Sequence, residues 1–143
     1  MIRTAIKIAW ELYGQPYRWG GDDPLAGFDC SGFVIEILKS VGVLPRKGDW
    51  TADGLYQSFA SNTCNPKPGA LMFRPNSNGK MIHVEFCLNE KLTIGASGGG
   101  SAVVDVGVAI AKNAFVKVRP ILIYTDPVIV DPFTANQRAA FDS

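Results

Sequence analysis

The chain has 143 residues and a formal net charge of +1, and 47% of its residues are hydrophobic while 19% are charged. This length suits one domain with a buried core, and this composition excludes a disordered chain. The near-neutral charge gives no reason to expect a nucleic-acid partner or electrostatic attraction to a membrane surface.

The first segment predicts an amphipathic helix over residues 2–13. Its apolar residues recur at helical spacing, and Gly14 and Pro16 follow as a stop signal. Charged residues interrupt the apolar run at three points along this helix. We therefore expect neither a signal peptide nor a membrane span at this end of the chain.

A loop and then a second helix are expected next. Residues 17–29 are rich in the turn formers Asp, Pro and Gly, and they predict an irregular loop. From Cys30 onward the apolar residues return at helical spacing, and Gly42 closes the run. Asp29 stands directly before this helix, where aspartate is a favoured N-cap.

Cys30 is the candidate nucleophile because it stands at the start of this helix. Free backbone N–H groups and the positive end of the helix dipole gather there, and both favour the thiolate form of a cysteine. The thiolate is the reactive form in covalent catalysis. The alternative is a small buried hydrophobic residue, which is the usual role of a free cysteine.

His83 is the one histidine of the chain, so an imidazole base supplied by this chain has to be His83.

The remaining residues predict one more helix and then a sheet. Thr51 can cap a short helix that ends near residue 59. The tail, residues 124–143, contains a short predicted helix over 134–141 and either packs on the domain or serves as a linker. Helices followed by a small antiparallel sheet predict an α+β fold. The strand-like segments are residues 70–74, 81–88, 92–96, 102–108 and 115–123.

Four motifs together resemble the NlpC-type cysteine peptidases of bacterial cell walls. The resemblance covers residues 1–123 and implies a papain-like α+β domain, in which the helix of the nucleophile packs on the sheet that carries the base. It also implies a cofactor-free enzyme that cuts peptidoglycan stem peptides, typically between D-γ-glutamate and the following diamino acid. The motifs are residues 16–21 (Pro-Tyr-Arg-Trp-Gly-Gly), 29–34 (Asp-Cys-Ser-Gly-Phe-Val), 68–73 (Pro-Gly-Ala-Leu-Met-Phe) and 83–84 (His-Val).

The resemblance assigns chemical roles to individual residues. Cys30 is expected to attack an amide carbonyl, and His83 is expected to act as its base. The backbone N–H of Cys30 and the side chain of Tyr17 are expected to hold the oxyanion.

Three further motif residues are candidates for contact with the substrate. Ser31 is expected in the wall of the nucleophile site. Asp29 is equally suited to capping the helix, and Trp19 is equally suited to the core.

The residue that orients the imidazole is where the sequence departs from the family pattern. The family usually places a polar residue, often histidine, on the strand after the base, and Gly95 occupies that position here. Glu85 is the nearest substitute, because residues two apart on a strand share a face with each other. The other options are Ser97, a backbone carbonyl or a water, and Glu85 would then be a solvated strand residue.

Other function classes stay open on the sequence. One is a noncatalytic wall-binding or virion structural domain that kept the fold, and another is an amidase or acyltransferase relative with the same nucleophile. Because no signal peptide is expected, one interpretation is a phage-encoded wall enzyme that is released by a holin or carried in the virion. An export signal removed from the chain is the other interpretation.

The cysteines and the remaining motifs predict no metal site. His83 and Cys87 are four residues apart, and on a strand this spans about 13 Å, too far for one ion. A disulfide between Cys64 and Cys87 stays open. Residues 95–99 match the Gly-x-Ser-x-Gly pattern of serine hydrolases, but no histidine follows them.

Overall fold

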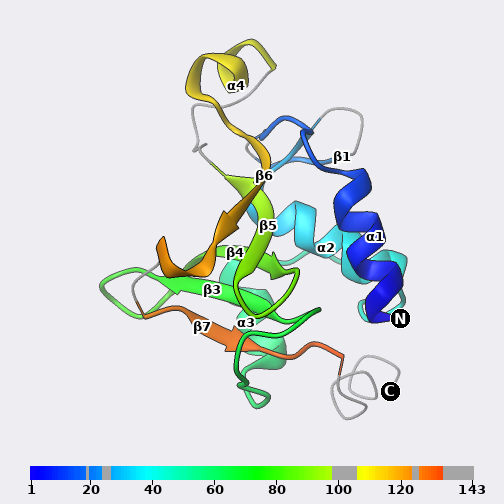
Figure 1. Ribbon diagram of the computed structural model, residues 1–143, viewed down its shortest axis with the longest axis vertical. Helices are drawn as coiled ribbons and strands as arrows, with labels where there is room; N and C mark the ends of the chain where they lie inside the picture. The colour runs from blue at the N-terminus through cyan, green and yellow to red at the C-terminus, as the bar shows by residue number, and fades with distance from the viewer. Residues whose placement is uncertain (19, 24–26, 98–105, 124–125, 134–143) are drawn as a thin grey trace.

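The computed structural model describes residues 1–18, 20–23, 27–97, 106–123 and 126–133 (Figure 1). Within these residues the regular elements are four α-helices and seven strands. The helices are α1 (Ile2–Glu11), α2 (Cys30–Ser40), α3 (Ala52–Phe59) and α4 (Val106–Lys112). The strands are β1 (Asp22–Asp23), β2 (Gly27–Phe28), β3 (Leu71–Pro75), β4 (Met81–Cys87), β5 (Leu92–Ser97), β6 (Phe115–Pro120) and β7 (Val128–Val130).

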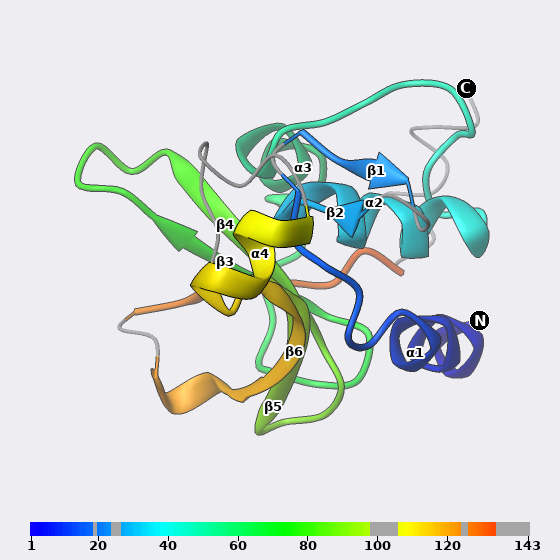
Figure 2. The same ribbon diagram turned by 90° about the horizontal axis from the view of Figure 1, so that it is seen from above.

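The main sheet is antiparallel and has the strand order β6-β5-β4-β3-β7. Helices α1, α2 and α3 lie on one side of this sheet, whereas α4 lies beyond one end of β6 (Figures 1 and 2). Helix α2 packs directly on β4 and β5. The predicted α+β class is therefore confirmed, and the helix that begins with Cys30 lies against the strand that carries His83.

Both predicted N-caps are present. Asp29 Oδ1 accepts a hydrogen bond from the Gly32 N–H at 2.7 Å, and Thr51 Oγ1 accepts one from the Gly54 N–H at 3.0 Å. These bonds satisfy N–H groups that the first turn of a helix leaves without a partner. The starts of α2 and α3 are thus set by local sequence, as predicted.

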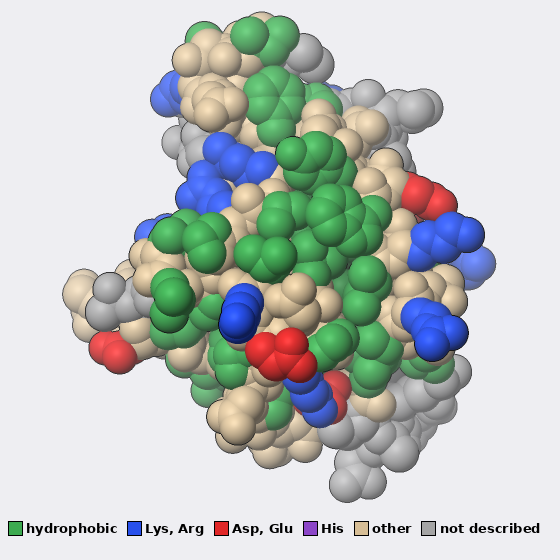
Figure 3. All heavy atoms as spheres, viewed as in Figure 1, with side chains coloured by type: hydrophobic (Ala, Val, Ile, Leu, Met, Phe, Trp, Pro, Cys, Tyr) green, Lys and Arg blue, Asp and Glu red, His purple; other side chains and the backbone are tan. Residues whose placement is uncertain are grey.

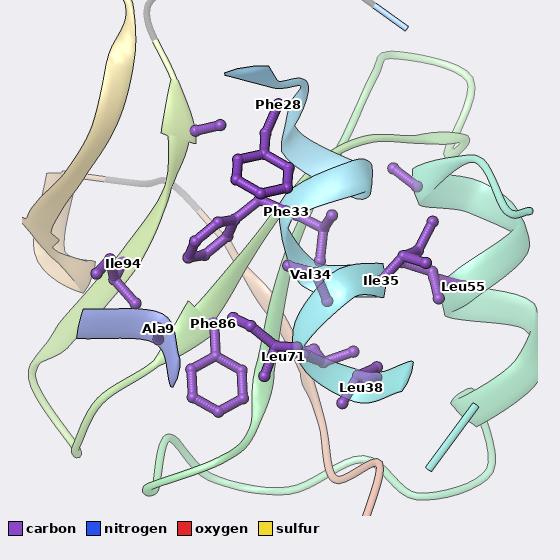
Figure 4. Close-up of a cluster of buried hydrophobic side chains, with 14 of the residues drawn as sticks. Ala9, Phe28, Phe33, Val34, Ile35, Leu38, Leu55, Leu71, Phe86 and Ile94 are labelled. Atoms are coloured by element: carbon purple, nitrogen blue, oxygen red, sulfur yellow. The ribbon is translucent and has the colours of Figure 1, made fainter. Parts of the chain in front are cut away.

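The hydrophobic core forms between α2 and the sheet (Figure 4). Phe28, just before the helix, packs edge-on against Phe33, with the ring centroids 5.9 Å apart. Both rings are fully buried, so close packing fixes the first turn of α2 and with it the position of Cys30. The labelled core residues in Figure 4 are Ala9, Phe28, Phe33, Val34, Ile35, Leu38, Leu55, Leu71, Phe86 and Ile94.

Two strand predictions in the C-terminal half are wrong in part. Within the predicted strand 102–108, residues 102–105 lie outside the described residues, and Val106 begins helix α4. Alternating valines favour a strand, but the Ala-Ile-Ala-Lys run that follows favours a helix, which ends before Asn113 with its φ of 53°. The predicted strand 115–123 stops at Pro120, which has no N–H for the ladder, and a single 3₁₀ turn (Ile121–Ile123) follows.

Two segments contain strands that were not predicted. Strands β1 and β2 pair with each other inside the expected irregular loop, residues 17–29. In the expected tail, β7 pairs with β3 at the edge of the main sheet, and Lys67 Nζ lies 2.6 Å from Asp131 Oδ2. The described part of residues 124–143 therefore packs on the domain, while the helix expected over 134–141 lies outside the described residues.

The described surface is mixed in character. Hydrophobic side chains cover much of the middle of the face in Figure 3, and charged side chains of both signs are scattered around them. Trp10 and Tyr13, at the end of α1, are about half exposed and lie with their ring centroids 5.9 Å apart. Across the described ranges, no helix combines the length and the apolar character that crossing a membrane requires.

Candidate active site

The nucleophile side of the site is built at the start of α2. Cys30 is the first residue of the helix and is half-buried. Asp29 Oδ1 accepts the Gly32 N–H, and Ser31 Oγ lies 3.4 Å from the same oxygen. Gly32 has no room for a side chain, because a Cβ there would collide with the carbonyl oxygen of Gly21. The preceding loop therefore lies tightly against the first turn of α2, the turn that begins with Cys30.

The segment that carries Tyr17 is fixed by backbone bonds to β6. The Gly14 N–H donates to the Val116 carbonyl at 2.9 Å, and the Val116 N–H donates to the Gln15 carbonyl at 2.7 Å. The Tyr17 N–H donates to the Ala114 carbonyl at 2.9 Å. The segment therefore runs alongside the start of β6, which holds Tyr17 in place.

Tyr17 itself is buried beside the nucleophile. Its phenol is close enough to Cys30 and Asp29 to feel their charges. Burial raises the pKa of Tyr17, and the negative charges of Cys30 and Asp29 raise it further. Tyr17 therefore keeps its proton at neutral pH, so its phenol is able to donate a hydrogen bond.

The base side of the site is built at the start of β4. The Met81 N–H donates to Asp53 Oδ1 at 3.0 Å, so α3 holds the beginning of this strand. His83 follows two residues later, and its side chain is 12% exposed. The ring is hydrogen-bonded to Cys30. The structure thus brings together the two residues that the sequence named as nucleophile and base.

Glu85 contacts His83 from the same strand, as the two-residue spacing predicted. Its Oε2 lies 2.7 Å from His83 Nε2, and its Oε1 accepts a hydrogen bond from Thr93 Oγ1 at 2.9 Å. Glu85 is 0% exposed, so the alternative of a solvated strand residue is wrong; these hydrogen bonds allow the carboxyl group to be buried. The other named side chain, Ser97, is buried with no hydrogen-bond partner for its Oγ among the described residues.

The pKa of His83 reflects these contacts. Burial alone would lower it, but hydrogen bonds to Cys30 and Glu85, together with the negative charges of both groups, raise it from 6.5 to about 9. The imidazole therefore carries its proton at neutral pH. A protonated ring next to Cys30 stabilises the thiolate, which is the form that attacks carbonyl carbon.

An open groove of about 410 Å³ runs past Cys30. A pocket of about 220 Å³ lies next to it, and Asp29 and Ser31 line both. Burial raises the pKa of Asp29; hydrogen bonds from Gly32, Ser31 and Gly20 lower it, and the charge of Asp49 raises it again. Trp19, the third expected substrate contact, lies outside the described residues. The residues that line the groove are Tyr17, Gly20, Asp29, Cys30, Ser31, Thr51, Ala52, Lys80, Met81 and Ile82.

Three residues of the site were not predicted from the sequence. Thr93 had a usable signal, because it stands two residues before Gly95 and therefore shares a strand face with it. Asp53 had none, because its bond to the strand of His83 joins residues far apart in the chain. Lys80 had none either, because it lies in a turn-rich segment, where an exposed lysine belongs to no periodic pattern or motif.

The other two cysteines differ from Cys30 in their surroundings. All three thiols are free, so the disulfide between Cys64 and Cys87 is not formed. Burial raises the pKa of Cys87, and the negative charges of Cys64 and Glu85 raise it further. Burial also raises the pKa of Cys64. Both therefore remain thiols at neutral pH. In the described part of the chain, no group of three or more His, Cys, Asp or Glu residues is arranged to hold a metal ion.

Residues 14–120 match the model of the NlpC/P60 family. The chain is 43% identical over 93 residues to the murein DD-endopeptidase MepH of Escherichia coli, a match that covers 58% of this chain and 33% of that protein. It is 50% identical over 44 residues to the bifunctional muramidase/DL-endopeptidase CwlT of Bacillus subtilis, covering 30% of this chain and 13% of that protein. The matches thus span a third or less of the length of these relatives.

Solved structures resemble the whole fold. The NlpC/p60 domain of the peptidoglycan hydrolase SagA superposes with a TM-score of 0.65 at 27% identity, over 92% of this chain and 98% of that one. The P60 domain of the antigen MAP1204 from M. avium subspecies paratuberculosis gives a TM-score of 0.65 at 25% identity, over 93% and 95%. The predicted papain-like arrangement is therefore confirmed.

Proposed function

The chain belongs to the NlpC/P60 family, and from that premise we propose that it is a cysteine endopeptidase that hydrolyses peptidoglycan stem peptides at the bacterial cell wall. The observation that carries this proposal is the contact of His83 with both Cys30 and Glu85. A nucleophile, a base and a group that orients the base are the three parts that acyl transfer requires. The names of MepH and CwlT support the substrate class.

The reaction proceeds through a thioester. The Cys30 sulfur attacks the carbonyl carbon of the scissile amide, and the resulting tetrahedral intermediate collapses when the C–N bond breaks. Protonated His83 gives its proton to the leaving amine, and the neutral ring then takes a proton from the water that hydrolyses the thioester. Nε2 of His83 is hydrogen-bonded to Glu85, so these protons are transferred by Nδ1, the other nitrogen of the ring.

Two donors hold the oxyanion of the tetrahedral intermediate. One is the backbone N–H of Cys30, which stands in the first turn of α2, where N–H groups have no partner within the helix. The other is the phenol of Tyr17, whose raised pKa keeps it protonated. Preorganised donors of this kind stabilise the transition state without reorganising during the reaction.

The scissile bond that we assign is the one between D-γ-glutamate and the diamino acid. The likeness to CwlT, which is named a DL-endopeptidase, supports this bond. The groove also suits a stem peptide, which carries an ammonium group and carboxylates, because its lining contains both Asp29 and Lys80. Opposite charges placed along a cleft favour one direction of binding.

Product analysis tests the assigned bond. We expect mass spectrometry of a digested tetrapeptide stem to show L-alanyl-D-glutamate and a dipeptide that begins with the diamino acid. A DD-endopeptidase, as MepH is named, would instead split cross-linked dimers and leave the single stem intact, which would contradict the assignment. A fragment joined to an added amine would identify an acyltransferase.

Thiol reactivity tests the catalytic pair without any substrate. In a variant with Cys64 and Cys87 replaced by serine, we expect iodoacetamide to alkylate Cys30 rapidly at pH 7, because protonated His83 stabilises its thiolate. His83→Gln removes that charge, so alkylation of Cys30 should slow by at least about 10-fold at pH 7. The rates are measured by mass spectrometry across pH 5 to 10.

The matched control keeps both catalytic residues. Lys112→Gln likewise replaces a basic side chain with glutamine, but at an exposed position in the last turn of α4, outside the site. Alkylation of Cys30 in this variant should match the parent. An alkylation profile that is the same with and without His83 would contradict the catalytic pair and favour a noncatalytic domain.

A further inference from the structure

The position that the family pattern reserves for a polar residue is filled from the neighbouring strand. In the pairing of β4 with β5, Phe86 lies opposite Ile94, so the next step of the register sets Glu85 against Gly95. A Cβ built on Gly95 would lie 2.7 Å from Cγ of Glu85 and 3.2 Å from its Cβ. Carbon atoms pack at about 3.5–4.0 Å, so the glycine leaves room that the Glu85 side chain occupies.

Thr93 holds the far side of the same carboxyl group. It stands two residues before Gly95 on β5, and it is 0% exposed. Its Oγ1 lies 2.9 Å from Glu85 Oε1, and 3.4 Å from the Arg119 carbonyl. The shorter contact is the better hydrogen bond, and a β-branched side chain has few rotamers from which to make it. Thr93 therefore fixes one oxygen of Glu85 while His83 contacts the other.

We propose that Thr93 and Gly95 are positioning residues that act through Glu85: together they form a seat on β5 that turns the Glu85 carboxylate toward His83. The seat allows Glu85 on β4 to orient the base in place of a polar side chain at position 95 on β5. This inference rests on the proposed function, in which Glu85 orients the base for Cys30. It adds two residues that touch neither the substrate nor the reacting atoms.

The charged neighbours of Glu85 decide which substitution is informative. Besides His83, Lys117 on β6 and Cys87 on β4 interact electrostatically with Glu85, and Lys117 lies opposite Gly95 in the pairing of β5 with β6. Replacing Glu85 would change its interaction with all three groups at once. Replacing Thr93 with valine keeps every charge and the shape of the side chain, so its effect reports the hydroxyl alone.

The first experiment follows the His83 ring by NMR across pH 5 to 11. Since His83 is the one histidine of the chain, its ring signals are assigned without ambiguity. We expect the ring to titrate at a pKa of about 9 in the parent and at a lower value, toward 6.5, in Thr93→Val. Thr93→Ser keeps the hydroxyl and should restore the parent value.

Activity on the stem peptide is measured on the same variants. Thr93→Val should lower kcat by about 10- to 100-fold with little change in KM, the size expected for losing a hydrogen bond to a charged group. Thr93→Ser should recover most of this loss. Ser97→Ala is the matched control: it removes a buried hydroxyl from the same strand, one with no hydrogen-bond partner among the described residues, and it should change neither the titration nor kcat.

The second experiment tests Gly95 through a double-mutant cycle with Glu85. Gly95→Ala should lower kcat by about 10-fold or more, because the new Cβ displaces the Glu85 side chain. In a Glu85→Ala background, residue 85 has no Cγ for the new Cβ to displace. Gly95→Ala should therefore lower kcat no further in that background. Thermal unfolding shows whether each variant folds. If Gly95→Ala does not fold, the Thr93 variants test the proposal without it.

The outcomes separate this inference from the proposed function. If Cys30→Ala leaves hydrolysis unchanged, the proposed function fails, while the NMR titration still tests the seat on its own. If Cys30→Ala abolishes hydrolysis but Thr93→Val matches the parent in both titration and kcat, the seat is wrong. Equal effects of Gly95→Ala with and without Glu85 would also overturn it.

Discussion

Replacing Cys30 with alanine is expected to abolish hydrolysis of stem peptides, with a loss in kcat of roughly 10⁴-fold or more. The methyl group cannot form the thioester, and among the described residues Cys30 is the cysteine that contacts the imidazole. Cys64 and Cys87 do not substitute for it, because burial raises the pKa of both. The measurement is release of the two peptide fragments, followed by mass spectrometry at substrate concentrations well above KM.

Cys64→Ala is the matched control for this substitution. Cys64 is also half-buried, but it lies against the edge strand β7, where its N–H donates to the Ile129 carbonyl. We expect this variant to retain the parent rate. Hydrolysis that persists in Cys30→Ala and disappears in Cys64→Ala would place the nucleophile elsewhere and refute the proposed site.

Replacing His83 with glutamine is expected to lower kcat by about 10²- to 10⁴-fold, the range for losing a general acid–base. Glutamine can still donate a hydrogen bond to Glu85, so the buried carboxyl group keeps a partner and the fold is preserved. The amide cannot protonate the leaving amine or activate water. Hydrolysis by His83→Gln at more than a tenth of the parent rate would exclude His83 as the base.

The pH profile of the parent enzyme checks the same residue without a substitution. The pKa of His83 is raised from 6.5 to about 9, so the protonated ring is fully present at neutral pH and is lost as the pH rises through about 9. Above that pH the thiolate loses its positive neighbour and the leaving amine loses its acid, so kcat/KM should fall. A profile that stays level to pH 10.5 would contradict this assignment.

The local part of the site could be predicted from the sequence. Asp29 and Thr51 cap their helices as expected, because capping depends only on residues within one turn. The contact of Glu85 with His83 followed from the period of a strand. In each case the decisive interaction joins residues at most three apart in the chain.

The burial of Glu85 could not be predicted in the same way. It depends on the open space at Gly95 and on the hydroxyl of Thr93, both on the next strand, and therefore on the register between β4 and β5. A glutamate on a strand is usually solvated, and the sequence alone does not reveal which glycine faces it.

The missed elements have a similar cause. Strand β7 gains its hydrogen bonds from β3 and from Cys64, both far earlier in the chain, and β1 and β2 are too short to show a period. In α4 the valines in its first turn suggested a strand, whereas the alanine-rich residues that follow them favour the helix that is observed.

The backbone bonds between the Tyr17 segment and β6 have a consequence for how the enzyme matures. The residues around Tyr17 are synthesised well before their partners at 114–116, which lie far along the chain from them. Closing so long a loop is slow, and it waits until nearly the whole domain has left the ribosome. A nascent or truncated chain that ends before Ala114 holds Cys30 and His83 but lacks the anchor of its oxyanion donor. We therefore expect the proposed active site to be complete only after residues 114–116 have been synthesised.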